Sequence, residues 1–200
     1  MRLTIPHSLA LLMAVALVTS PAAAAQTQPS SAGQPLRSEL AFDYTYIRSN
    51  APPGGCGCFN LNGGSGSYAW DLRPTRFALV GEVTGTHAGS IGSGAYNLTL
   101  TAYTAGVRYL VPVRGRALRP FGQLLIGAAH GGGSLVEGTA PPARERTVFT
   151  ANLGGGLDLR VARHFSIRLI DASYLVSVFQ NQVNDHQNNL RLSAGAAFRF

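Results

Sequence analysis

The sequence has 200 residues, of which 46% are hydrophobic and only 12% are charged, and its formal net charge at pH 7 is +7. This length suits one domain with its own core and is too short for us to expect two. All 16 basic residues are arginines, spread singly along the chain without forming a patch, so we expect no nucleic-acid partner. Beyond residue 25 no apolar run reaches about 18 residues, which excludes a transmembrane helix.

Residues 1–25 have the features of a secretory signal peptide. Arg2 gives a short positive start, residues 9–18 form an apolar run, and residues 21–25 end in small side chains suited to cleavage. We therefore expect the mature chain to begin at Gln26. Residues 26–37 are rich in Gln, Ser and Pro and predict a flexible periplasmic linker, which leaves residues 38–200 for the folded domain.

This domain alternates apolar and polar side chains with a period of two, which is typical of β-strands. Phe42 and Tyr44, for example, share one face of the first strand, and Asp43 lies on the other. Eight strands are predicted, over residues 38–49, 67–73, 76–85, 100–110, 120–130, 147–161, 165–175 and 188–200.

The connections between these strands alternate between long and short. Long Gly-rich or polar loops are expected over 49–66, 86–97, 131–146 and 176–188, and tight turns near 73–75, 113–118 and 162–164. A soluble sandwich has no reason to place every long loop at one end, whereas an outer-membrane barrel has short periplasmic turns and long outer loops. The sequence therefore predicts an all-β fold, an eight-stranded antiparallel up-and-down transmembrane β-barrel.

In this interpretation the apolar faces contact lipid and the polar faces enclose a packed lumen. Aromatic residues should form two girdles, with Tyr46, Trp70 and Phe149 toward the loops and Phe198 and Phe200 toward the turns. Arginine suits a lumen because its planar fork pairs with carboxylates. The lumen ion pairs are expected among Asp43, Asp71, Glu82, Arg108, Asp158, Arg160, Asp171 and Arg191.

The seventh strand tests this scheme, because Arg168 and Asp171 fall on opposite faces. We expect Asp171 to face inward, with Arg168 snorkelling from the lipid face to the nearby interface. Ile167 and Leu169 would then point into the lumen, unless a β-bulge intervenes.

The last strand ends in "AAFRF", with Phe200 at its end. Together with "RPFGQLLIGAAHG" and the strand count, this segment resembles the small OmpA/OmpX-type outer-membrane β-barrel proteins. The resemblance implies a bacterial outer-membrane location, a surrounding of outer-membrane lipid and lipopolysaccharide, a monomer, and recognition of the last strand with Phe200 by the barrel assembly machinery. We expect a non-catalytic surface or envelope protein with no cofactor.

Three alternatives remain open. "RHFSI" places His164 and Ser166 at the spacing of a lipid A deacylase pair, although both would lie at the periplasmic turn and no third group is visible. A narrow channel and a soluble lipocalin-like barrel of the periplasm are the other two.

Cys56 and Cys58 are the only cysteines, and in an exported chain they predict a tight, strained disulfide. Thiolate and imidazole groups also form a soft-metal set, so Cys56, Cys58, His87, His130 and His186 are weaker candidates for a metal site at the outer mouth.

Overall fold

The structure is a computed structural model that describes residues 37–49, 58–91, 96–115, 117–133, 145–179 and 186–200. The predicted signal peptide, and the linker up to residue 36, lie outside these ranges. No helix among the described residues is long and apolar enough to cross a bilayer.

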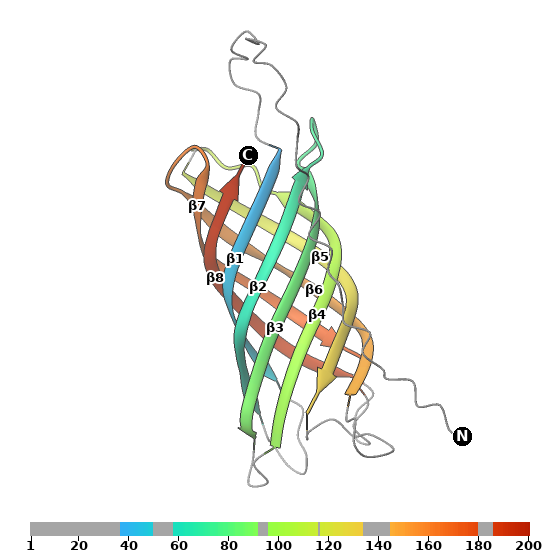
Figure 1. Cartoon of the computed structure of the whole chain (residues 1–200). Helices are drawn as coiled ribbons and strands as arrows, with labels where there is room; N and C mark the ends of the chain where they lie inside the picture. The colour runs from blue at the N-terminus through green and yellow to red at the C-terminus, as the bar shows by residue number, and fades with distance from the viewer. Residues whose placement is uncertain (1–36, 50–57, 92–95, 116, 134–144, 180–185) are drawn as a thin grey trace, which may run out of the picture. The chain divides into compact units, whose positions relative to one another are not determined.

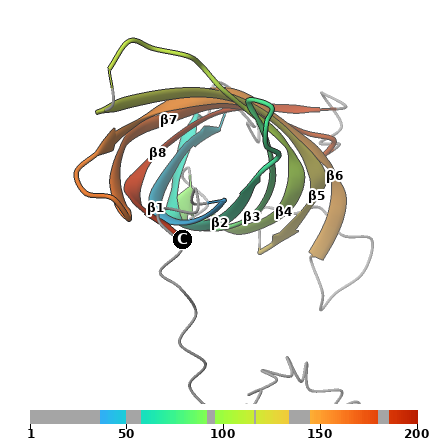
Figure 2. The same ribbon diagram turned by 90° about the horizontal axis from the view of Figure 1, so that it is seen from above.

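Eight antiparallel strands close into one barrel in sequence order, as Figures 1 and 2 show. This arrangement confirms the predicted fold class. The strands are β1 (Ser38–Ser49), β2 (Phe59–Asp71), β3 (Phe77–Ile91), β4 (Tyr96–Leu110), β5 (Leu118–Gly132), β6 (Glu145–Arg160), β7 (Phe165–Ser177) and β8 (Gln187–Arg199).

The barrel closes where the last strand pairs with the first. Glu39 lies opposite Arg199 and Ser49 opposite Asn189, so β8 follows β1 over nearly its whole length. Backbone hydrogen bonds of 3.0 Å join Ser38 and Phe200 in both directions and extend this pairing to the final residue. Closure pairs the edges of β1 and β8 with each other along the barrel wall, and the hydrocarbon core of a bilayer requires such pairing of backbone groups.

Side chains alternate between an apolar outer surface and a polar interior. In β1 Phe42 and Tyr44 are 57% and 60% exposed, whereas Asp43 is 6% exposed and Thr45 is fully buried. This arrangement, with apolar side chains outside and polar side chains inside, is the reverse of that in a soluble protein. It holds around the barrel, where Leu79, Tyr103 and Leu153 also point outward. The predicted assignment of the apolar faces to the outside is therefore confirmed.

The barrel wall extends further toward the loops than the sequence pattern predicted. β2 begins at Phe59, inside the expected 49–66 loop, and β3 continues to Ile91. The Gly-rich start of β2 pairs on both sides, and a Cβ atom at Gly63 would lie 2.0 Å from the carbonyl oxygen of Gly85. Glycine here permits close approach of two strands. Because glycine is also common in loops, the same residues are predicted as a loop from the sequence.

Aromatic rings form a girdle at the end of the barrel that carries the turns. Three ring pairs lie there, and their centroid separations are 5.2 Å for Phe77 and Tyr109, 5.3 Å for Phe165 and Phe198, and 6.5 Å for Tyr68 and Phe200. Trp70 belongs to this girdle, so its predicted position near the loops is wrong. β2 runs toward the turns, and Trp70 is its penultimate residue.

Candidate functional site in the barrel interior

The interior of the barrel contains two stacked regions. A large apolar cluster lies toward the loops, and charged side chains lie in the middle of the barrel and toward the turns, together with a smaller apolar cluster of Ala69, Ala78, Val80 and Leu125. The apolar cluster consists of Ile47, Phe59, Leu61, Ala88, Ile91, Leu100, Ala102, Ala129 and Leu175. The charged side chains come from five different acids and four arginines, and they carry the chemistry of the interior.

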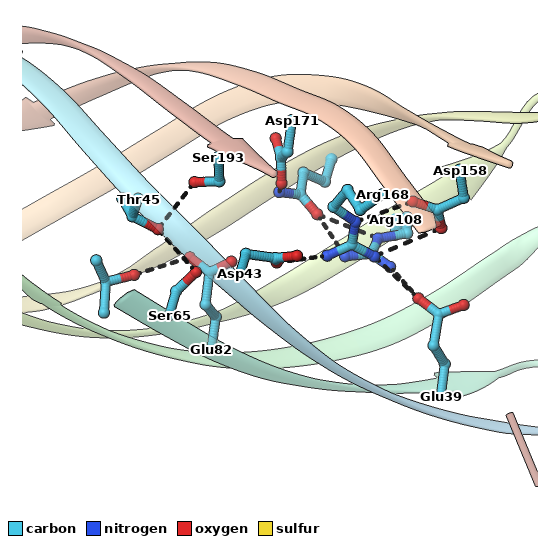
Figure 3. Close-up of polar contacts among 12 residues, drawn as sticks. Glu39, Asp43, Thr45, Ser65, Glu82, Arg108, Asp158, Arg168, Asp171 and Ser193 are labelled. Carbon is cyan, nitrogen blue, oxygen red and sulfur yellow. Dashed lines mark hydrogen bonds and ion pairs between the residues drawn. The ribbon is translucent and has the colours of Figure 1, made fainter. Parts of the chain in front are cut away.

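Arg168 lies at the centre of the charged region, with a side chain that is 0% exposed. Its guanidinium group donates hydrogen bonds to Asp158 Oδ1 at 2.9 Å and to Asp43 Oδ2 at 3.0 Å. A third, to Glu39 Oε1, is 3.0 Å long (Figure 3). One arginine on β7 thereby joins β6 and β1 across the lumen.

The prediction that Arg168 faces lipid is wrong. The register between β7 and β8 shifts between Arg168 and Asp171, which is a β-bulge. Leu169 and Ile170 within this bulge are 46% and 45% exposed, so two successive side chains point outward and both flanking charges point inward. Ile167 also faces outward, which corrects its expected place in the lumen together with that of Leu169.

Glu39 is the second centre of the network, and its role was not predicted. Its carboxylate accepts hydrogen bonds from Arg108 at 2.9 Å and from Arg168 at 3.0 Å, and it also pairs with Arg199. The available signal was its parity, because Glu39 shares the inward face of β1 with Asp43. The partners lie on β4, β7 and β8, and no feature of a single sequence specifies such contacts.

Arg108 is held by an amide and an aromatic ring in addition to Glu39. Its Nε and Nη2 donate to Gln123 Oε1 at 3.1 and 3.0 Å, and Gln123 Nε2 donates to Asp171 Oδ2 at 2.9 Å. The guanidinium carbon lies 4.3 Å from the ring centroid of Phe121, a cation–π distance. Gly156 leaves space for this ring, since a Cβ atom there would lie 2.6 Å from Phe121 Cζ.

A second ion pair lies nearer the middle of the barrel. Arg191 binds Glu82 through both of its terminal nitrogens, at 2.7 and 3.1 Å, in the bidentate geometry that arginine favours. Its Nη2 also lies 3.3 Å from Ser65 Oγ. Thr45 Oγ1 links that serine to Ser193, at 3.0 and 2.9 Å (Figure 3).

Six of the eight charged residues predicted for the lumen are buried there: Asp43, Glu82, Arg108, Asp158, Asp171 and Arg191. Asp71 is only half-buried and lies 4.0 Å from Arg73 at the barrel end. Arg160 is exposed, and its Nε donates to the carbonyl oxygen of Ala162 at 3.4 Å. The interior place predicted for Arg160 is wrong, because this last residue of β6 reaches past the barrel end to water.

The structure gives no support to the candidate metal ligands within its described residues. Cys56 lies outside them, so its disulfide with the exposed Cys58 stays a prediction. His87 and His130 bond Thr99 and Thr147 on the outer surface, at 3.0 and 2.9 Å. His186 is exposed. In the described part of the chain no three His, Cys, Asp or Glu side chains come together as metal ligands.

His164 and Ser166 do not form a hydrogen-bonded pair among the contacts of the described residues. His164 is exposed at the turn end, with Nδ1 2.8 Å from the carbonyl oxygen of Arg199. Ser166 is buried, and its Oγ has no hydrogen-bond partner in the described part of the protein. A nucleophile needs its base within hydrogen-bond reach, which this arrangement does not provide.

A cavity of ≈ 10 Å³, measured as the space open to the centre of a water molecule, lies between the second ion pair and the apolar cluster. It has room for about one water molecule. Its lining residues are Ile47, Glu82, Thr84, Leu100, Ala102, Thr104, Asn152, Leu175 and Arg191.

Two solved structures of outer-membrane proteins share this architecture. The neisserial surface protein A structure matches with a TM-score of 0.61 and 12% sequence identity, covering 82% of this chain and 97% of that one. The attachment invasion locus protein of Yersinia pestis, Ail, was solved in complex with the heparin analogue sucrose octasulfate. It matches with a TM-score of 0.51 and 17% identity over 82% of this chain and 97% of that one. At these identities the likeness shows the fold.

No curated protein matches the sequence. A family model described as the outer membrane protein β-barrel domain matches residues 9–198, which is most of the chain. With the closed eight-stranded barrel, the lipid-type outer surface and the charged interior, this match establishes that the chain belongs to the outer membrane protein β-barrel family and resides in the bacterial outer membrane.

Proposed function

We propose that this protein is a non-catalytic barrel that holds its long loops at the cell surface and conducts no solutes through its lumen. The observation that carries the proposal is the filled interior. Among the described residues a charged network occupies the middle of the barrel and its turn side, an apolar cluster lies toward the loops, and the cavity between them has a volume of ≈ 10 Å³. The loops that such a barrel displays would contact external molecules or support the envelope.

The charged network resists opening because each group depends on several others. Glu39 alone pairs with arginines on three strands, and Arg168 pairs with three acids. Removing one partner of a buried ion pair typically costs about 3–5 kcal/mol, because the other charge is left uncompensated. An ion that crossed the lumen would have to separate several such pairs and then pass an apolar layer.

We further propose the partners of the outer surface. The exposed apolar side chains of the barrel wall fit acyl chains of outer-membrane lipid and lipopolysaccharide, with the protein as a monomer. Phe198 and Phe200 lie exposed on β8 and its end, where the assembly machinery would recognise the last strand. No observation favours nucleic acid.

Planar-bilayer recording of the purified protein tests the sealed lumen. We expect no steady open conductance, while a porin inserted under the same conditions serves as the positive control. A reproducible unitary conductance from the purified protein would refute the proposal.

The enzyme alternative has its own test, namely the mass of lipid A from cells that express the protein. We expect this mass to be unchanged. A change in mass that disappears in the Ser166→Ala variant would assign catalysis to the pair with His164 and overturn the non-catalytic function.

A further inference from the structure

Exposed arginines gather at the end of the barrel that carries the turns. One precedes β1, two lie in the β2–β3 turn, one lies in the β4–β5 turn, one ends β6 and one lies in the β6–β7 turn. The sequence spreads these residues singly along the chain, and only closure of the barrel brings them to one end. We name this set the arginine rim: Arg37, Arg73, Arg76, Arg114, Arg160 and Arg163.

Little exposed negative charge balances the arginine rim. Asp71 is the one acid of the described turn end with a partly exposed side chain, 14% by area, and it lies 4.0 Å from Arg73. Glu39 and Asp158, the nearest other acids, are buried in the interior network. The turn end therefore presents a strongly positive surface.

The shape of this surface identifies the kind of partner. The turns leave the barrel between β2 and β3, between β4 and β5, and between β6 and β7, and Arg37 lies beside the seam of β1 and β8. The rim is thus a ring around the whole circumference, whereas a compact partner would contact only one part of that ring. Directly next to it lies the girdle of Tyr68, Trp70 and Phe77, the level at which a barrel meets lipid headgroups.

We infer that the arginine rim binds the phosphate headgroups of anionic phospholipids in the periplasmic leaflet. A guanidinium group matches phosphate oxygens with two parallel N–H donors and keeps its charge at any physiological pH. A planar annulus of headgroups reaches every arginine of a ring at once. This inference is independent of the proposed function, because a conducting barrel could carry the same rim.

Trp70 is a built-in reporter for this contact. It is the only tryptophan of the chain, it is 53% exposed on the outer surface, and its Cα partner Ser38 directly follows Arg37. Arg76 lies in the adjoining turn, where Leu72 bonds the backbone of Phe77. Brominated acyl chains quench tryptophan fluorescence on contact, so quenching at Trp70 measures which lipids occupy this part of the annulus.

The experiment uses the folded full-length mature chain in vesicles of phosphatidylcholine and phosphatidylglycerol, with one or the other lipid brominated. We expect phosphatidylglycerol to be favoured at Trp70 by about fivefold, the effect of one arginine near an anionic surface. Raising the salt concentration to 0.5 M should remove most of this preference in the unaltered protein. The measurement at high salt uses the unaltered protein, so it does not depend on the folding of any variant.

Variants identify the groups responsible. The double variant Arg37→Gln/Arg76→Gln should lose the preference, and Arg37→Lys/Arg76→Lys should keep most of it. The matched control is Arg48→Gln at the opposite end, where Arg48 bonds Asn60 at 2.8 Å, and we expect no change.

Equal quenching by both lipids, or a preference that survives in the glutamine variant, would overturn the inference. Loss of binding to isolated peptidoglycan by that variant, without any lipid preference, would assign the rim to the cell wall instead.

Discussion

Arg168 is the residue whose loss should damage the barrel most. Its side chain is 0% exposed, and three carboxylates, those of Glu39, Asp43 and Asp158, lie within 3.0 Å of its nitrogens. The variant Arg168→Met keeps a long side chain of similar reach but removes every donor. Of the three acids, only Glu39 retains other arginine partners, so Asp43 and Asp158 lose their direct ion pairs.

We expect Arg168→Met to lower the free energy of unfolding by about 3–5 kcal/mol, the usual cost of breaking one buried ion pair from one side. The value should fall at the upper end of this range, because two buried carboxylates lose their partner together. The assay is urea unfolding in lipid vesicles, followed by Trp70 fluorescence and by the heat-dependent gel mobility of folded barrels.

Two further variants test the reasoning. Arg160→Gln removes an exposed arginine from the neighbouring strand end and should leave the unfolding midpoint unchanged. Asp158→Asn combined with Arg168→Met should recover part of the stability, because one of the stranded charges is then neutral. If Arg168→Met unfolded at the same urea concentration as the unaltered protein, the charged network would not stabilise the barrel as argued.

Two other results are expected from the geometry of the wall. Spin labels at Leu169 and at Ile170 should both be accessible to oxygen dissolved in lipid and shielded from a water-soluble relaxation agent, whereas a regular strand would give opposite results at successive positions. Gly195→Ala should fail to reach the heat-resistant folded form on gels, because its Cβ would lie 2.1 Å from the carbonyl oxygen of Phe42. Gly81→Ala, with nothing within 4 Å of its Cβ, should fold normally.

The fold was predictable because lipid and a closed lumen impose a strict period of two. A single strand such as β1 already shows which side is buried, since Asp43 lies between Phe42 and Tyr44. The order of long and short connections then gives the topology, because each strand of an up-and-down barrel pairs with the next. These features are local, so they can be read from one sequence.

The errors arose where local reading is insufficient. The bulge after Arg168 changes which face each side chain occupies, and no residue type marks it, since Leu169 and Ile170 are ordinary strand residues. Trp70 lies at the turn end because β2 runs from the loops toward the turns, a direction that aromatic character alone does not indicate. The role of Glu39 depends on contacts with three other strands, which are not visible in its own strand. The interior network depends on register and closure, which the alternation alone does not contain.

The position of each arginine matters more to this protein than the net charge of the chain. Five acids are buried in the interior, Glu39, Asp43, Glu82, Asp158 and Asp171, against three buried arginines, Arg108, Arg168 and Arg191, and the nearly buried Arg199. The interior is therefore close to neutral, as a space without bulk water requires. The net positive charge of the chain therefore lies outside the lumen, and in the described residues most of it lies on the arginine rim. The basic composition thus separates into a nearly neutral network inside the barrel and a positive ring at its turn end.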